Sequence, residues 1–246
     1  MKNNKVIKAL WMYLRLTDAY KGAIIFYFAA IIILVIEAIR LAQSPNEEVL
    51  HSMLGVVQYC HIFGCFVSLF GNQTIIQRKI FPSCGISKIV VCIAPIIICL
   101  FYCLFYDIIA SIIAIINFGV ELFKNFIVVA AINSASAMIV SAIYGRKIWW
   151  LNVLGFVLYT NIVLGGTSIA LGGTGIASTI GMKITWPIEY VLLISAGIGI
   201  AGFMVAVLLS LYCWKKGDKY RECKKADLSG NLVEIESVIF YNVKNI

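Results

Sequence analysis

Charged side chains are scarce in this chain. Only 13% of its 246 residues are Asp, Glu, Lys or Arg, whereas about 25% is usual in soluble domains. Hydrophobic residues make up 61%, and the mean hydropathy is +0.94. Apolar runs of about 20 residues recur along the chain, and this is the length that crosses a hydrocarbon core of roughly 30 Å. The composition excludes an ordinary soluble domain and indicates an all-α integral membrane protein.

Several catalytic motifs are also absent. The chain has no Gly-Lys dipeptide, so it lacks the Gly-rich loop GxxxxGK[ST] that holds the phosphates of ATP. The two His residues, His51 and His61, form no HExxH pair, and no later His could pair with Ser168 in a Ser-His dyad. Ala170 also stands where a GxSxG motif around Ser168 needs Gly. We expect no catalytic residues and no enzyme activity in this chain.

The eight Cys residues show no CxxC spacing of the kind used in metal and redox sites. Most of them fall within apolar runs, where small buried side chains are the usual role of Cys. We therefore expect free thiols, no disulfide bonds and no metal site.

Six apolar runs divide the chain. They cover about residues 22–42, 53–71, 88–118, 126–144, 148–170 and 189–213. Each run is predicted to be one transmembrane helix, which gives a membrane domain over residues 22–213. An amino-terminal segment, 1–21, precedes this domain, and a tail, 214–246, follows it.

The positions of Lys and Arg predict the orientation, because these residues collect on the cytoplasmic side of membranes. With six spans and both termini in the cytoplasm, only Arg40, Lys124 and Lys183 of the 20 basic residues lie outside. The run 88–118 is long enough to be a hairpin around Asp107 instead. That alternative divides the basic residues evenly between the two sides, so the charge pattern favours one long helix.

The segment 1–21 has the spacing of an amphipathic helix. Ile7, Leu10, Trp11 and Leu14 recur at intervals of three and four residues. Such a helix lies in the membrane interface with its basic residues at the lipid headgroups. A positively charged anchor that only sets the topology is the alternative.

A few polar residues interrupt the predicted spans. A charge at the centre of a membrane helix costs about 2.5 to 3.5 kcal/mol, so such groups usually face other protein groups or a watery cavity. Asp107 could line a cavity or lie at the headgroups, and Glu37 with Arg40 is predicted to form a local ion pair. Other polar residues could join helices or line a substrate path. The candidate path residues are Asp107, Asn133, Ser136 and Asn161.

Small residues are prominent in the last run. Gly197, Gly199 and Gly202 lie at intervals that allow close contact between helices. Spacing of this kind is common in membrane helices and does not identify a function.

The stretch "LFGNQTIIQRKIFPSCGISKIVV", residues 69–91, carries a resemblance to a known family. It is similar to the region between the second and third spans in permease subunits of type-2 ABC exporters. The amphipathic amino-terminal segment, the six runs and the Gly-rich stretch before the last run also resemble that family. The likeness covers nearly the whole chain in architecture, while the residue motif itself is loose.

The resemblance implies a coupling helix within the loop 72–87, which would dock in a separate ATPase subunit. Its expected contact residues are Ile75, Ile76, Gln77, Arg78, Lys79, Ile80 and Phe81. ATP and Mg would bind to the partner ATPase, and no cofactor is expected on this chain. The tail departs from the minimal family pattern and receives no role.

The implied function is ATP-driven export across a cell membrane, with a bacterial peptide such as an antimicrobial peptide as the expected substrate class. The expected partners are the ATPase, a second permease copy or a homologous permease, and the lipid bilayer, with no nucleic acid. A membrane immunity or scaffold protein without ATP coupling and a small secondary transporter are the alternatives. A secondary transporter usually has internal repeats, and the two halves of this sequence are not visibly similar.

Overall fold

The structure is a computed structural model and describes residues 5–17, 19–43, 61, 65, 87–144, 146, 148–170 and 185–218. Every regular element in these ranges is a helix, which confirms the all-α expectation for this part of the chain. Among the described residues, three stretches are long and apolar enough to cross a membrane. They are Lys88–Ile112, Phe126–Ile143 and Ile188–Lys216, and a shorter apolar helix covers Trp149–Thr160.

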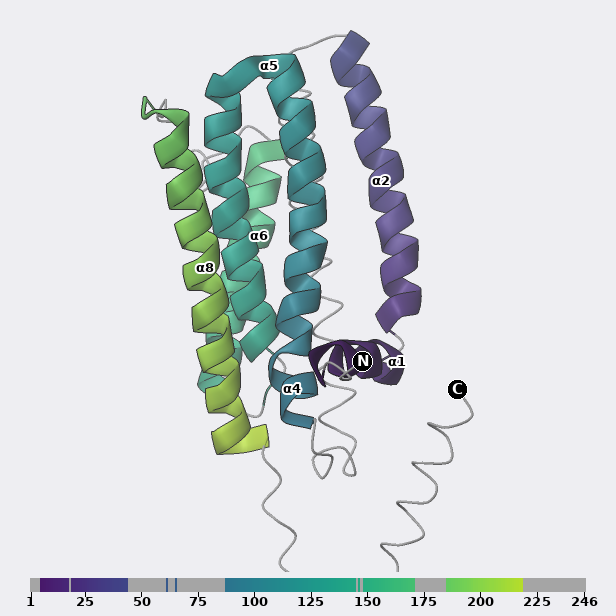
Figure 1. Cartoon of the computed structure of the whole chain (residues 1–246), viewed down its shortest axis with the longest axis vertical. Helices are drawn as coiled ribbons and strands as arrows, with labels where there is room; N and C mark the ends of the chain where they lie inside the picture. The colour runs from purple at the N-terminus through teal and green to yellow at the C-terminus, as the bar shows by residue number, and fades with distance from the viewer. Residues whose placement is uncertain are drawn as a thin grey trace, which may run out of the picture.

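Helix α1 (Lys5–Thr17) lies across one end of the other helices, as Figure 1 shows. Its buried face consists of Ala9 and Tyr13, which have no exposed surface. Ile7 and Trp11, from the predicted apolar face, are 65% and 57% exposed. The helix therefore packs on the protein through a second face, whereas Ile7 and Trp11 point away from the bundle, where lipid could cover them.

Helix α2 (Ala19–Gln43) rises from α1 along the side of the bundle (Figure 1). Leu34 and Glu37 are buried on its inner side. The predicted ion pair is confirmed, because Arg40 Nη1 lies 3.0 Å from Glu37 Oε1. The three-residue spacing puts both side chains on one face of the helix, where such pairs form readily.

Helix α5 (Ala94–Ile143) reverses direction within its length. Its backbone departs from helical geometry at Gly119, where φ is 75°, a conformation that Gly adopts without the steric cost of a side chain. Figure 1 shows two rods joined by a short helical piece across one end. The part before Gly119 is here called the first arm (residues 94–118), and the part after it the second arm (residues 120–143). Asp107 lies within the continuous first arm, so the chain does not turn there.

The remaining helices pack around α5. They are α4 (Ser87–Cys92), α6 (Trp149–Ala170) and α8 (Ile188–Cys213), and a short π-helix, η2 (Trp214–Asp218), follows α8. Helix α8 packs mainly against α5. A buried cluster joins both arms of α5 to α6 and α8. It contains Ile96, Met138, Ala142, Ile143, Leu151, Ala206 and Cys213.

The helices predicted from the apolar runs are found where the structure describes the chain. Helix α2, the second arm of α5, α6 and α8 lie on the runs 22–42, 126–144, 148–170 and 189–213. The run 88–118, predicted as one helix, is covered by α4 and the first arm of α5, which are divided at Ile93. Only His61 and Cys65 are described in the run 53–71, and both are helical. Most of the tail, from residue 219 onward, lies outside the described residues.

One glycine of the last run makes a close helix contact. A Cβ atom added at Gly202 would lie 2.8 Å from Ala135 Cα, closer than side-chain carbons approach. A Cβ atom at Gly197 or Gly199 would meet nothing within 4 Å. Of the three glycines, Gly202 alone is required for the approach of α8 to the second arm of α5.

We expect Gly202→Ala to destabilise the protein by about 1–3 kcal/mol, because an added methyl group forces the two backbones apart. Gly197→Ala is the matched control and should be neutral or stabilising, since Ala favours a helix over Gly by up to about 1 kcal/mol. The measurement is thermal unfolding in detergent, followed by maleimide reaction of buried thiols. Equal unfolding midpoints for the two variants would contradict the close contact.

Candidate functional site

Two regions of the structure are candidate sites: the end of the bundle where α1 and α4 meet, and a cavity between α5 and α8. In the sequence, the predicted coupling residues come shortly before α4, which begins at Ser87 and forms part of the first region. Those residues, Ile75, Ile76, Gln77, Arg78, Lys79, Ile80 and Phe81, lie outside the described residues.

A hydrophobic cluster holds α1 against α4 and the beginning of α5. It contains the buried residues Ala9, Tyr13, Val90, Val91 and Ala94, with Trp214 from η2 packed against it. Burial raises the pKa of Tyr13 above its usual range, and the nearby positive charge of Arg146 opposes that shift. The Tyr13 hydroxyl therefore stays protonated at neutral pH.

Pro95 leaves one backbone carbonyl oxygen beside this cluster without its usual helical hydrogen bond. Proline has no N–H group, so it cannot donate the usual helical hydrogen bond to the carbonyl oxygen of Val91, four residues earlier. Arg146 supplies the missing donor from a distant part of the chain. Its Nη2 atom donates to Val91 O at 2.7 Å.

Arg146 also contacts other elements at this end of the bundle. It is only 3% exposed, its Nε donates to Ala142 O at 3.1 Å, and its Nη2 lies 3.0 Å from Ser210 Oγ. Asn152, on α6, donates to the Arg146 carbonyl oxygen at 2.6 Å. One buried residue thus connects α4 with the end of α5, with α6 and with α8. We call this set of contacts the Arg146 joint.

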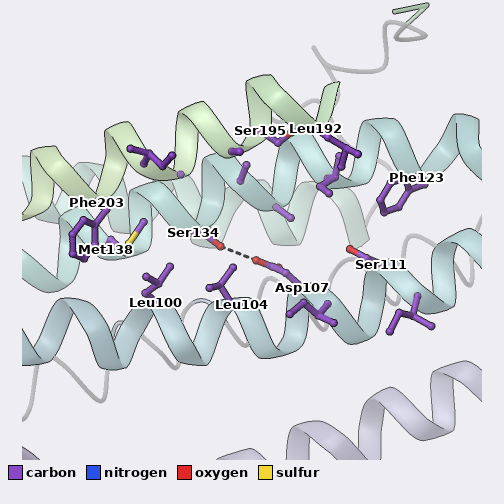
Figure 2. Close-up of a pocket in the computed structure, with 18 of the residues that line it drawn as sticks. Leu100, Leu104, Asp107, Ser111, Phe123, Ser134, Met138, Leu192, Ser195 and Phe203 are labelled. Atoms are coloured by element: carbon purple, nitrogen blue, oxygen red, sulfur yellow. Dashed lines mark hydrogen bonds between the residues drawn. The ribbon is translucent and has the colours of Figure 1, made fainter. Parts of the chain in front are cut away.

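The second region is a cavity of about 950 Å³ between the arms of α5 and α8, shown in Figure 2. Its walls come from residues 100–115, 123–138 and 192–203. Most of the lining side chains are apolar. Those with polar groups are Asp107, Ser111, Ser134 and Ser195.

Asp107 is the only ionisable group among the residues that line this cavity. Ser134 Oγ donates to Asp107 Oδ2 at 2.7 Å, across the gap between the two arms (Figure 2). His61, fully buried, places Nε2 3.0 Å from Ser134 Oγ and 3.3 Å from Asp107 Oδ2. The three side chains therefore form one polar cluster in otherwise apolar surroundings.

Two buried polar atoms at the cavity lack a hydrogen-bond partner among the described residues. They are Asp107 Oδ1 and Ser195 Oγ. Nε2 of His61 lies 3.2 Å from Oδ1 but is not aligned for a hydrogen bond with it. Buried polar atoms are nearly always paired in proteins, so each exception calls for an explanation.

The structure separates the predicted path residues. Asp107 lines the cavity, whereas Asn133 and Ser136 are partly buried and are not among its lining residues. The side chain of Asn161 lies outside the described residues. Ser111 and Ser195 were not predicted as site residues. The spacing of Ser111, one helical turn after Asp107, could have indicated it.

Free thiols lie next to the polar cluster. Cys65, Cys99 and Cys103 are buried in one group with Ala137 and Val140. Cys65 lies four residues after His61, and Cys103 lies four residues before Asp107. Within the described ranges, no group of His, Cys, Asp and Glu residues is arranged to hold a metal ion.

Comparison of the chain with protein-family models, with curated proteins and with solved structures finds no match.

The Arg146 joint leads to a test of stability. Arg146→Leu leaves Val91 O and Ser210 Oγ without this donor, so we expect a loss of about 2–4 kcal/mol in stability. Arg146→Lys keeps the charge but not the planar set of donors, and its loss should be intermediate. The measurement is the temperature at which buried thiols become reactive to a maleimide in detergent.

Lys216→Leu is the matched control for this test. Lys216 is also basic but lies exposed on η2, where a surface substitution changes stability by at most about 0.5 kcal/mol. Similar unfolding temperatures for Arg146→Leu and Lys216→Leu would show that the Arg146 joint does not hold the bundle together.

Proposed function

We propose that this chain is the membrane-spanning permease subunit of an ABC exporter in the cytoplasmic membrane of a bacterium. A separate ATPase would hydrolyse ATP and dock on the segment 75–81. The proposal includes six spans, with both termini in the cytoplasm, and a second permease copy or a homologue as partner. Export of a peptide is the substrate class that the family resemblance implies.

The observation that carries this proposal is the packing of α4, the helix that follows the predicted coupling segment in the sequence, against α1. The chain enters α4 at Ser87, and α4 is packed directly against α1 through Val90, Val91, Ala9 and Tyr13. Coupling between two proteins requires an element with discrete arrangements that both partners can bias. A short helix held in a buried cluster satisfies this need better than a solvated loop does.

The Arg146 joint extends the same argument into the bundle. A displacement of α4 changes the position of Val91, which is bonded to Arg146 at 2.7 Å. Arg146 in turn contacts Ser210 near the end of α8. Movement of the coupling segment would therefore reach both helices that line the cavity.

Loss of the predicted aromatic contact tests the proposal. We expect Phe81→Ala to weaken the complex with the ATPase by about 2 kcal/mol, or about thirtyfold, because buried aromatic residues are frequent hot spots of interfaces. The tagged full-length chain would be purified from native membranes, and the copurified ATPase and its ATP hydrolysis would be measured. Phe101→Ala is the control, since Phe101 is 67% exposed on the first arm of α5.

Two results would contradict the proposal. Failure of the unmodified chain to retain any ATP-hydrolysing protein would favour the scaffold or secondary-transporter alternatives. Equal retention by Phe81→Ala and Phe101→Ala would show that the segment 75–81 is not the docking element.

A further inference from the structure

The unpaired polar atoms of the cavity indicate the chemistry of a ligand. Asp107 Oδ1 is a buried acceptor whose hydrogen bond is missing among the described residues. The other carboxylate oxygen, Oδ2, already accepts from Ser134. His61 Nε2 is the nearest nitrogen to Oδ1, at 3.2 Å and without a hydrogen bond to it, so the carboxylate can accept a further donor. A charged donor gives the strongest hydrogen bond to a carboxylate.

Ser195 supplies the second acceptor. Its Oγ is also buried without a partner in the described part of the chain, and Ser195 is 6% exposed. Figure 2 shows it on α8, on the opposite wall from Asp107. A primary ammonium group carries three donors and no acceptor, so it suits a site that offers a carboxylate and a hydroxyl oxygen.

The rest of the cavity suits an apolar chain. Its polar residues lie near the middle of the cavity and toward Ser111, whereas Leu100, Met138 and Phe203 line the other end (Figure 2). The lining along the first arm covers residues 100–115, which corresponds to about 22 Å at 1.5 Å per residue. The cavity volume lies at the upper end of the range of about 300–1,000 Å³ that is usual for ligand sites.

The cavity opens toward the outer face of the bundle. Ile108 and Ile112, both in its lining, are 57% and 53% exposed. A molecule dissolved in the surrounding bilayer could therefore enter from the side, without passing through water.

From this geometry we infer that the cavity is a binding site for a single-chain amphiphile with a protonated primary amine. The ammonium group donates to the Asp107 carboxylate and lies near Ser195. The alkyl chain extends toward Leu100, Met138 and Phe203. Binding by this chain alone requires no ATPase, so the inference goes beyond the proposed function and is tested separately from it.

Radiolabelled dodecylamine is the probe. The full-length chain would be placed in nanodiscs of zwitterionic lipid, which carry no net charge to concentrate an amine. We expect saturable binding that unlabelled dodecylamine displaces. Dodecanol has the same chain but no charge, and dodecyltrimethylammonium has the charge but no N–H donor. Each should compete at least about tenfold less well, since a charge-assisted hydrogen bond is worth roughly that factor or more.

Variants locate the site. Asp107→Asn should weaken dodecylamine binding by about tenfold or more, and Ser195→Ala by about threefold, in line with loss of a charged and a neutral hydrogen bond. Glu37→Gln is the matched control, because Glu37 is a buried carboxylate of α2 outside the cavity. It should bind dodecylamine as the unmodified chain does.

Equal competition by dodecanol would show an apolar groove with no selectivity for an amine and would overturn the inference. Undiminished binding by Asp107→Asn, or the absence of saturable binding in the unmodified chain, would also overturn it. The comparison of the three competitors uses the unmodified protein, so the test remains decisive even if a variant fails to fold.

Discussion

The hydrogen bond from Arg146 to the carbonyl oxygen of Val91 is the contact on which one end of this molecule depends. Pro95 makes that oxygen available, because it removes the helical donor that would normally occupy it. A buried guanidinium group is costly unless its donors are satisfied. Here they bond to carbonyl oxygens and to Ser210 at distances of 2.7 to 3.1 Å, which join α4, α5 and α8.

The cavity and the tightest helix contact are neighbours. Gly202 meets Ala135, and the adjacent residues Phe203 and Ser134 line the cavity. Helix α8 therefore lies very close to the second arm of α5 at Gly202, and the cavity begins directly beside this contact. This arrangement gives the proposed permease a firm end, at the Arg146 joint, and an open region with a carboxylate, at Asp107. The same two arms of α5 connect them.

The sequence predicted the helices well but the contacts between them poorly. Apolar runs identify helices such as α6 and α8 because membrane-length helices need continuous hydrophobic sequence. The sequence predicts only that Arg146 lies on the cytoplasmic side, since the pairing of its side chain with Val91 depends on tertiary structure. It allows both a headgroup and a cavity position for Asp107 for the same reason. The partnership of Asp107 with His61 and Ser134 requires three separate segments to meet, which periodicity within one helix cannot show.

The central claim is that this bundle crosses the membrane with the Arg146 joint at the cytoplasmic face, where an ATPase would dock. Single Cys residues introduced at Thr185 and at Lys215, in a variant without native Cys, would test it in intact cells with a membrane-impermeant maleimide. Thr185 precedes α8 and Lys215 follows it. The account predicts labelling at Thr185 and none at Lys215 until the cells are opened. Labelling of intact cells at Lys215, or at both positions, would contradict it.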